Sequence, residues 1–259
     1  MICALLGGIG WALNGYGLFL IFVFAGLLVA AGMWWYADRA VLGLVRAREL
    51  PLGESPGLHS TVERLAALAG VLKPRLYVMV DGLPRACAAG RGPRSSALAV
   101  SRGLLQALPP AELEGVLAHE LAHIRHRDVF VQSVAVVTAA VIVESSRIGG
   151  WFRRWLIFVL GPVAAAFVHL LLSPKREFEA DRAAALLLGS PHGLAAALVR
   201  LDQASELVQF EGSPVAEPLY TINPFEQKGL AALFASHPPV EERVRRLRAL
   251  DRDAPVLAA

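Results

Sequence analysis

Long apolar segments interrupt an otherwise mixed sequence. Residues 1–37 contain no charged side chain, residues 129–148 carry two charges close to their end, and residues 155–173 contain one ionisable group, a histidine. A helix that crosses a bilayer needs about 20 consecutive apolar residues. The pattern therefore predicts at least one crossing near the N-terminus and a two-helix membrane hairpin over residues 129–173.

The N-terminal segment has further marks of a membrane anchor. Asn14-Gly15 fits a turn, which favours two tightly connected crossings within residues 1–37. Trp34-Trp35-Tyr36 resembles an interfacial aromatic belt. A cleaved signal peptide is the alternative, but a basic start is missing. Residues 38–54 mix arginines with Leu and Val at helical spacing, which predicts an interfacial helix followed by a linker.

The segments between the apolar runs alternate between helix and strand patterns. Residues 59–70 have an amphipathic helical spacing that stops at Gly70, whereas residues 75–80 and 97–101 are typical of strands. Pro109-Pro110 followed by acidic residues is a favourable helix start. We expect a mainly α-helical fold with a small β-sheet.

These patterns predict four regions. Residues 1–37 form the membrane anchor, 38–128 the first part of a catalytic domain, 129–173 the transmembrane hairpin, and 174–259 the second part of the catalytic domain. A short loop joins the hairpin helices, so the two parts of the catalytic domain share one side of the membrane. More Lys and Arg flank the hairpin on that side, which predicts a cytoplasmic catalytic side of a cell (inner) membrane.

Composition agrees with a membrane protein. Hydrophobic residues make up 55% of the 259 residues, and the mean hydropathy is +0.50. The formal charge of +3 is modest, and its scattered arginines give no reason to expect a nucleic-acid partner. Cys3 and Cys87 are too far apart in the sequence to suggest a disulfide framework, which favours a reducing compartment.

An H-E-x-x-H motif lies in the helix that follows Pro110. The i, i+4 spacing stacks His119 and His123 on one helical face, where both imidazoles can bind one zinc ion. Hydrolytic zinc needs three protein ligands and an open position for water, and Glu120 can take a proton from that water. Across the hairpin, Glu177 or Glu179 could supply the third ligand.

The chain resembles the HtpX-like family of membrane zinc metallopeptidases along nearly its whole length. The likeness rests on HELAHIRHRD at residues 119–128, REFEAD at 176–181 and SHPP at 236–239. It implies a zincin-type (gluzincin) domain with one zinc ion per chain, held by His119, His123 and Glu177. Members commonly have Asn-Ala-Phe where this chain has Arg85-Ala86-Cys87, so their substrate contacts do not carry over at that point.

The resemblance also suggests roles for two more residues. The aspartate that matches Asp181 supports the metal ligands from behind. His237 matches a histidine before Pro-Pro that could donate a hydrogen bond to a developing oxyanion and so be catalytic. The other interpretation of His237 is a helix cap, because Pro238-Pro239 and acidic residues follow it.

Two other histidines fit structural roles better. His126 would close the position that water needs if it bound the metal, so we interpret it as interfacial. His169 lies in an apolar span without a partner at recognisable spacing, which favours a neutral packing histidine.

The predicted function is endopeptidase hydrolysis of membrane or misfolded proteins, with Glu120 as the base. The substrates would be proteins or peptides beside the lipid bilayer. Three alternatives are maturation of prenylated peptides, a zinc-binding membrane sensor, and a metal-stapled scaffold without turnover. The length of the chain argues against the first two, and a scaffold has no need of Glu120 between its ligands.

Overall fold

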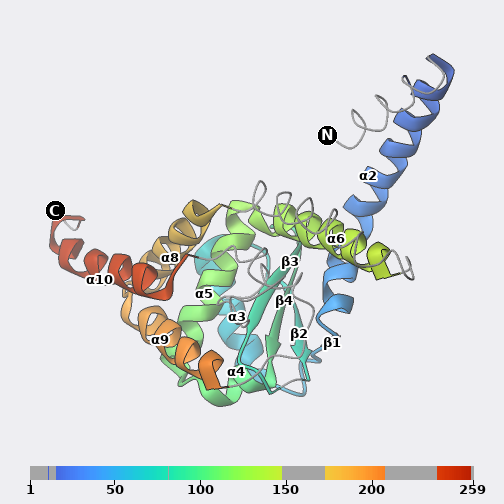
Figure 1. Ribbon diagram of the computed structural model, residues 1–259. Helices are drawn as coiled ribbons and strands as arrows, with labels where there is room; N and C mark the ends of the chain where they lie inside the picture. The colour runs from blue at the N-terminus through green and yellow to red at the C-terminus, as the bar shows by residue number, and fades with distance from the viewer. Residues whose placement is uncertain (1–10, 12–15, 81, 148–172, 208–237, 258–259) are drawn as a thin grey trace.

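The computed structural model describes residues 11, 16–80, 82–147, 173–207 and 238–257, and these form a mainly helical protein around one small mixed sheet (Figure 1). In chain order the elements are α2 (Tyr16–Leu44), β1 (Ala47–Glu49), α3 (Pro56–Ala69), β2 (Arg75–Met79), β3 (Ala86–Gly92), β4 (Ser95–Ser101), α4 (Arg102–Ala107), α5 (Pro110–His126), α6 (Asp128–Arg147), α8 (Pro174–Leu188), α9 (His192–Leu207) and α10 (Val240–Leu257). The predicted fold of helices with a small sheet is confirmed.

The sheet has the strand order β1-β2-β4-β3, which leaves β3 at one edge. β2 runs parallel to β4, and β1 and β3 are antiparallel to their neighbours. The strands predicted at 75–80 and 97–101 are present. The interfacial helix predicted over 38–54 is wrong at β1, because α2 ends at Leu44 and Ala47–Glu49 then pair with β2.

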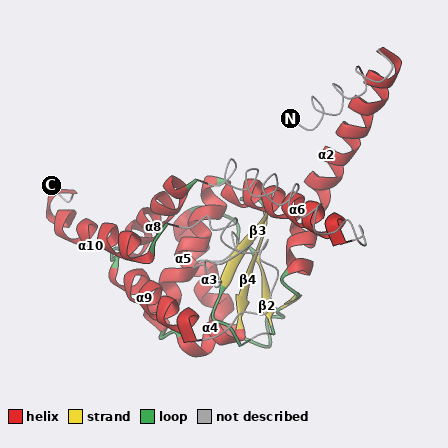
Figure 2. Ribbon diagram, viewed as in Figure 1, coloured by secondary structure: helices red, strands yellow, loops and turns green. Residues whose placement is uncertain are grey.

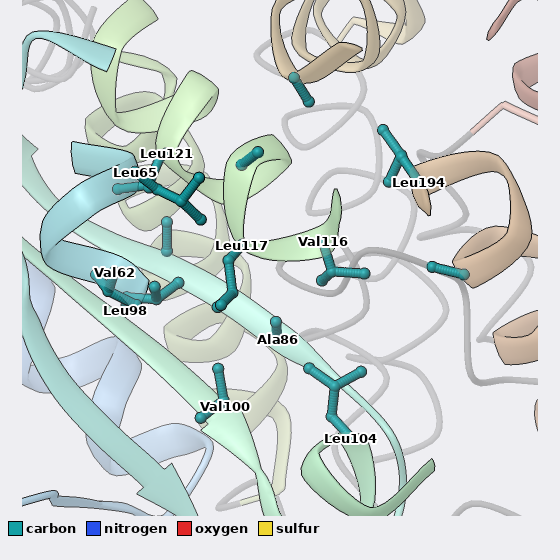
Figure 3. Close-up of a cluster of buried hydrophobic side chains, with 14 of the residues drawn as sticks. Val62, Leu65, Ala86, Leu98, Val100, Leu104, Val116, Leu117, Leu121 and Leu194 are labelled. Carbon is teal, nitrogen blue, oxygen red and sulfur yellow. The ribbon is translucent and has the colours of Figure 1, made fainter. Parts of the chain in front are cut away.

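Helices α3 and α5 build the hydrophobic core against the sheet. Leu117 and Leu121 of α5, Leu98 of β4 and Leu65 of α3 belong to one buried cluster, in which Leu121 lies beside Leu65 (Figure 3). These side chains are completely buried. Burial of each such side chain contributes roughly 1.5–3 kcal/mol. The packing fixes α5, the helix that carries the H-E-x-x-H motif, on a rigid support.

The other side of α5 lies against α9. A Cβ atom on Gly115 would stand 2.6 Å from the backbone nitrogen of Leu194, and one on Gly193 would stand 2.5 Å from the carbonyl oxygen of Ala111. The two helices therefore approach too closely for any side chain at these two points. Two hydrogen bonds from Arg200 to Glu112, of 2.7 and 2.9 Å, tie the same pair of helices together.

The N-terminal part of helix α2 extends away from the rest of the protein, as Figures 1 and 2 show, whereas its C-terminal part packs against α6 and the sheet. Its exposed side chains include Leu20, Phe24, Leu28 and Trp35. At its C-terminal end, the buried carboxylate of Asp38 accepts a 3.0 Å hydrogen bond from Arg75 of β2.

No helix among the residues that the structure describes is both long and apolar enough to span a membrane.

Two predictions about membrane segments fall largely outside these residues. The predicted Asn14-Gly15 turn lies outside the described residues, as do residues 148–172 of the hairpin predicted over 129–173. The first half of the predicted hairpin is α6, which starts at Asp128, two residues after α5 ends at His126. The helix that carries the H-E-x-x-H motif therefore continues almost directly into the next one.

Candidate metal centre and active site

Helix α5 places the two histidines of the motif side by side. The Nε2 atoms of His119 and His123 lie 3.2 Å apart, and their rings stand at 90° with centroids 4.7 Å apart. An i, i+4 spacing on one helical face predicts that the two side chains lie next to each other in this way. Both side chains are almost fully buried, at 1% and 3% exposure.

Helix α8 brings a carboxylate to the same point. Glu177 lies 3.3 Å from Nε2 of His123 through Oε1 and 3.6 Å from Nε2 of His119 through Oε2. The neighbouring acid of the REFEAD segment, Glu179, is exposed and pairs with Lys175 at 3.5 Å. The structure therefore brings Glu177 to the two histidines and leaves Glu179 at the surface.

The donor atoms of these three side chains suit a zinc ion. One ligand atom from each of His119, His123 and Glu177 lies within 4.8 Å of the other two. Zinc–nitrogen bonds of about 2.0–2.1 Å in a tetrahedral site put neighbouring ligand atoms roughly 3.3 Å apart. The 3.2 Å between the two Nε2 atoms and the 3.3 Å from Nε2 of His123 to Oε1 of Glu177 match that spacing, and the 3.6 Å contact to His119 comes from the other oxygen of the same carboxylate. Two imidazoles and one carboxylate are a donor set of hydrolytic zinc sites.

His119 is held from behind by an aspartate and an arginine. Its Nδ1 atom lies 2.9 Å from Oδ1 of Asp181, one turn after Glu177 on α8. Asp181 also accepts hydrogen bonds of 2.9 Å and 2.7 Å from Nε and Nη2 of Arg243, which comes from α10. Arg243 is 1% exposed, and its Nη1 atom lies 3.6 Å from Glu177. A hydrogen bond at Nδ1 fixes the ring so that Nε2 faces the metal position.

His123 has a matching arrangement. Its Nδ1 atom lies 3.2 Å from Oδ2 of Asp128, the first residue of α6. The other oxygen of Asp128 lies 3.4 Å from Nη1 of Arg176 on α8. Each histidine therefore has its own buried aspartate, and each aspartate has its own arginine.

The charges of the cluster favour a divalent cation. Four buried carboxylates, Glu120, Asp128, Glu177 and Asp181, share the site with the guanidinium groups of Arg176 and Arg243. Metal-binding imidazoles are neutral, so this arrangement has two negative charges in excess. Buried charge is costly unless it is compensated, and a zinc ion would compensate it.

The pKa values of the buried groups reflect the charges of their neighbours in the cluster. Burial lowers the pKa of His123, but the charge of Glu177 and the hydrogen bond to Asp128 outweigh it and raise that pKa from 6.5 to about 10. Burial raises the pKa of Asp181, but Arg243 and His119 outweigh it and lower that pKa from 3.8 to about 2. Burial also opposes the charge of Arg243, yet Asp181 and Glu177 raise its pKa above the usual value. A metal ion that binds through Nε2 of His123 would therefore compete with a proton at this ring.

Glu120 follows the first histidine and is 3% exposed. It precedes His123 by three residues, so the two side chains are neighbours on the surface of α5. Its negative charge also contributes to the raised pKa of His123. The carboxylate therefore lies beside the candidate metal position without being one of the three grouped ligands.

The remaining histidine predictions have different outcomes. His126 is exposed at the end of α5 and does not belong to the group of His119, His123 and Glu177, so its interfacial interpretation stays a prediction. His169 and His237 lie outside the described residues, so their predicted roles stay predictions.

Arg243 and Asp128 are two residues of the site whose roles the sequence analysis did not identify. Val240, Val244 and Leu247 form an apolar stripe on α10, and Arg243 occupies a position of that stripe. An arginine within an apolar stripe indicates a buried charge, and a buried charge needs a partner, so the sequence did contain a signal for the role of Arg243. Asp128 was part of the quoted motif, but the left-handed turn at Arg127 that brings it to His123 is seen only in the structure.

Comparison with known proteins places the chain among peptidases. The model of "Peptidase family M48" matches residues 53–251. The protease HtpX homolog of Pelotomaculum thermopropionicum is 38% identical over 267 residues, which cover 96% of this chain and 95% of that protein. The protease HtpX homolog of Pyrococcus abyssi is 37% identical over 264 residues, covering 95% of this chain and 91% of that protein.

A solved structure shares the fold. Ste24p of S. mikatae superposes with a TM-score of 0.56 at 19% identity, over 95% of this chain. This chain spans 61% of the length of that protein. At this identity the likeness concerns the fold alone.

Proposed function

Because the chain belongs to peptidase family M48 and is a membrane-associated zinc metalloprotease, we propose that His119, His123 and Glu177 hold its zinc ion and that Glu120 is the general base. The observation that carries this proposal is the meeting of the three donor groups within 4.8 Å, from two helices far apart in the sequence. Asp181 acts as the support of His119, through the 2.9 Å contact to Nδ1.

In this proposal each residue of the site has its own role in peptide hydrolysis. A zinc ion at this position supplies Lewis-acid polarisation of the scissile carbonyl and makes water acidic enough to react near neutral pH. Glu120 accepts the proton of the attacking water and passes it to the nitrogen of the leaving amine. Asp181 and Arg243 keep the ring of His119 in one orientation, so that its Nε2 atom stays available as a ligand.

The edge of the sheet offers a place for the substrate. β3 is an edge strand, and α5 packs against it. An extended peptide can add to such an edge through main-chain hydrogen bonds, and this would place its backbone beside the H-E-x-x-H helix. We propose that segments of membrane or misfolded proteins bind there, because a peptide must be unfolded to pair in this way.

The site faces the cytoplasm in this proposal. Arg125, Arg127, Lys175, Arg176 and Arg182 flank the predicted hairpin on the catalytic side, against three arginines of the opposite loop at 147, 153 and 154. The side of the membrane with more Lys and Arg is usually the cytoplasmic one, which favours a cytoplasmic position for the catalytic domain. Residues 1–37 and 129–173 are the membrane segments in this proposal.

A pair of histidine variants tests the proposed zinc site. His123→Ala should lose zinc and cleavage of an unfolded protein substrate by the detergent-purified enzyme, because it removes one of three ligands. His126→Ala changes an exposed histidine on the same helix and should keep both. Equal zinc content and cleavage in the two variants would overturn the assignment.

A further inference from the structure

The carboxylate of Asp128 is shared between a proposed zinc ligand and an arginine. Oδ2 lies 3.2 Å from Nδ1 of His123, and Oδ1 lies 3.4 Å from Nη1 of Arg176. Asp128 is 7% exposed, and the Nη1 atom of Arg176 is buried. Each oxygen therefore has one specific partner in a site with little water to screen the charges.

The backbone places Asp128 at this point. Helix α5 ends at His126 and is capped by Arg127, which has a left-handed conformation with φ 64° and whose N–H donates to the carbonyl oxygens of His123 and Ile124. This turn brings the next residue back toward the last turn of α5, where His123 lies. A left-handed conformation is uncommon for residues other than glycine, so the tight turn comes at a cost in strain.

The same carboxylate joins two segments of chain. Asp128 begins α6, and Arg176 lies in the first turn of α8. The Asp128–Arg176 ion pair therefore joins the start of α6 to the start of α8 beside the side chain of His123.

We propose that Asp128 is a positioning residue for the zinc ligand His123 and that Arg176 acts on the metal only through Asp128. This inference rests on the proposed zinc site. A hydrogen bond donated by Nδ1–H of His123 to the carboxylate of Asp128 leaves Nε2 free to bind, and it selects the ring orientation in which Nε2 faces His119 and Glu177. Arg176 holds the carboxylate in place and keeps the end of the predicted membrane hairpin against the metal site.

The contacts around His119 indicate how large the effect should be. Asp181 lies 2.9 Å from His119 and receives two hydrogen bonds from a buried arginine. The contacts of Asp128 are longer, at 3.2 and 3.4 Å, and its arginine side chain is 35% exposed. Loss of such a partner typically weakens metal binding by about 10- to 100-fold. We expect Asp128→Ala to fall toward the lower end of that range.

Zinc affinity, measured by competition with a chromophoric chelator on the full-length protein in detergent, tests the proposal without relying on activity. Asp128→Ala should bind zinc about 10-fold more weakly than the wild type. Arg176→Gln should show a smaller loss, and Arg176→Lys should recover part of it. The double variant Asp128→Ala/Arg176→Gln should be no weaker than Asp128→Ala alone, because Arg176 acts through Asp128. Arg182→Gln, an exposed arginine on the same helix, is the matched control and should bind like the wild type.

The outcomes separate this inference from the proposed function. A wild-type chain that binds no zinc would overturn the proposed site itself. Wild-type affinity in Asp128→Ala, or additive losses in the double variant, would overturn the role of Asp128 or of Arg176 while leaving the site intact. If Asp128→Ala does not fold, Asp128→Asn and its double variant with Arg176→Gln provide the same comparison, because Asn keeps the shape and one acceptor but loses the charge.

Discussion

Arg243 donates two hydrogen bonds to the carboxylate of Asp181, of 2.9 Å from Nε and 2.7 Å from Nη2, and both side chains are almost fully buried. The pair joins α10 to α8, and through Asp181 it reaches Nδ1 of His119 at 2.9 Å. The last described helix of the chain is therefore part of the support of the candidate metal centre. A bidentate arginine–carboxylate pair fixes orientation as well as charge.

Breaking this pair should destabilise the protein strongly. Arg243→Met leaves Asp181 as an uncompensated buried charge, which costs about 3–5 kcal/mol. Arg248→Gln changes an exposed arginine of the same helix and should stay within about 0.5 kcal/mol. Urea unfolding of the zinc-free proteins measures the difference. Equal midpoints for the two variants would contradict the structural role of Arg243.

Acid should remove the contribution of Asp181 to stability. The pKa of this group is lowered to about 2 in the folded protein from 3.8. A lowered pKa stabilises the folded state above the unfolded value, and the effect is lost as the pH falls through the folded value. Between pH 5 and pH 2 the loss should be about 2 kcal/mol. Unfolding of zinc-free wild type and Asp181→Asn at both pH values should show this excess loss in the wild type alone.

The two glutamates of the REFEAD segment should behave differently. Glu177→Ala removes the carboxylate that lies 3.3 Å from His123, so we expect loss of bound zinc and of peptidase activity. Glu179→Ala truncates an exposed side chain on the same helix and should keep both. Metal analysis of the purified variants decides between them. Retention of zinc by Glu177→Ala together with its loss from Glu179→Ala would reverse the assignment.

Removal of zinc should lower thermal stability. Binding to the folded state at 100 times the dissociation constant adds about 2.7 kcal/mol, which corresponds to a Tm change of about 5–10 °C for a chain of this size. A thermal unfolding scan with and without a chelator measures the change. His123→Ala lacks a ligand, so its Tm should not respond to the chelator. A chelator-insensitive wild type would argue against a metal at this site.

The motif and its helix could be predicted from the sequence because they depend on local spacing. Pro109-Pro110 starts α5 where predicted, and the i, i+4 spacing brings His119 and His123 together. Sequence reasoning from the residues left Glu177 and Glu179 open, and the resemblance favoured Glu177. Only the packing of α8 on α5 shows which of the two carboxylates points inward.

Other features depend on contacts that sequence periodicity does not contain. β3 consists mainly of Ala and Gly, which have low strand propensity, and it forms because β4 pairs with it. β1 is three residues long and continues a stretch with helical spacing. Arg243 is far from the zinc motifs in sequence, and its role follows from the approach of α10 to α8.

The most direct test of the account is the zinc content and peptidase activity of Glu120→Gln, purified in detergent beside the wild type. Glutamine keeps the size of the side chain but cannot take the proton from water, and His119, His123 and Glu177 are unchanged. We predict one equivalent of zinc in both proteins and cleavage of an unfolded protein substrate by the wild type only. Undiminished cleavage by Glu120→Gln with zinc bound would contradict the assignment of Glu120 as the base.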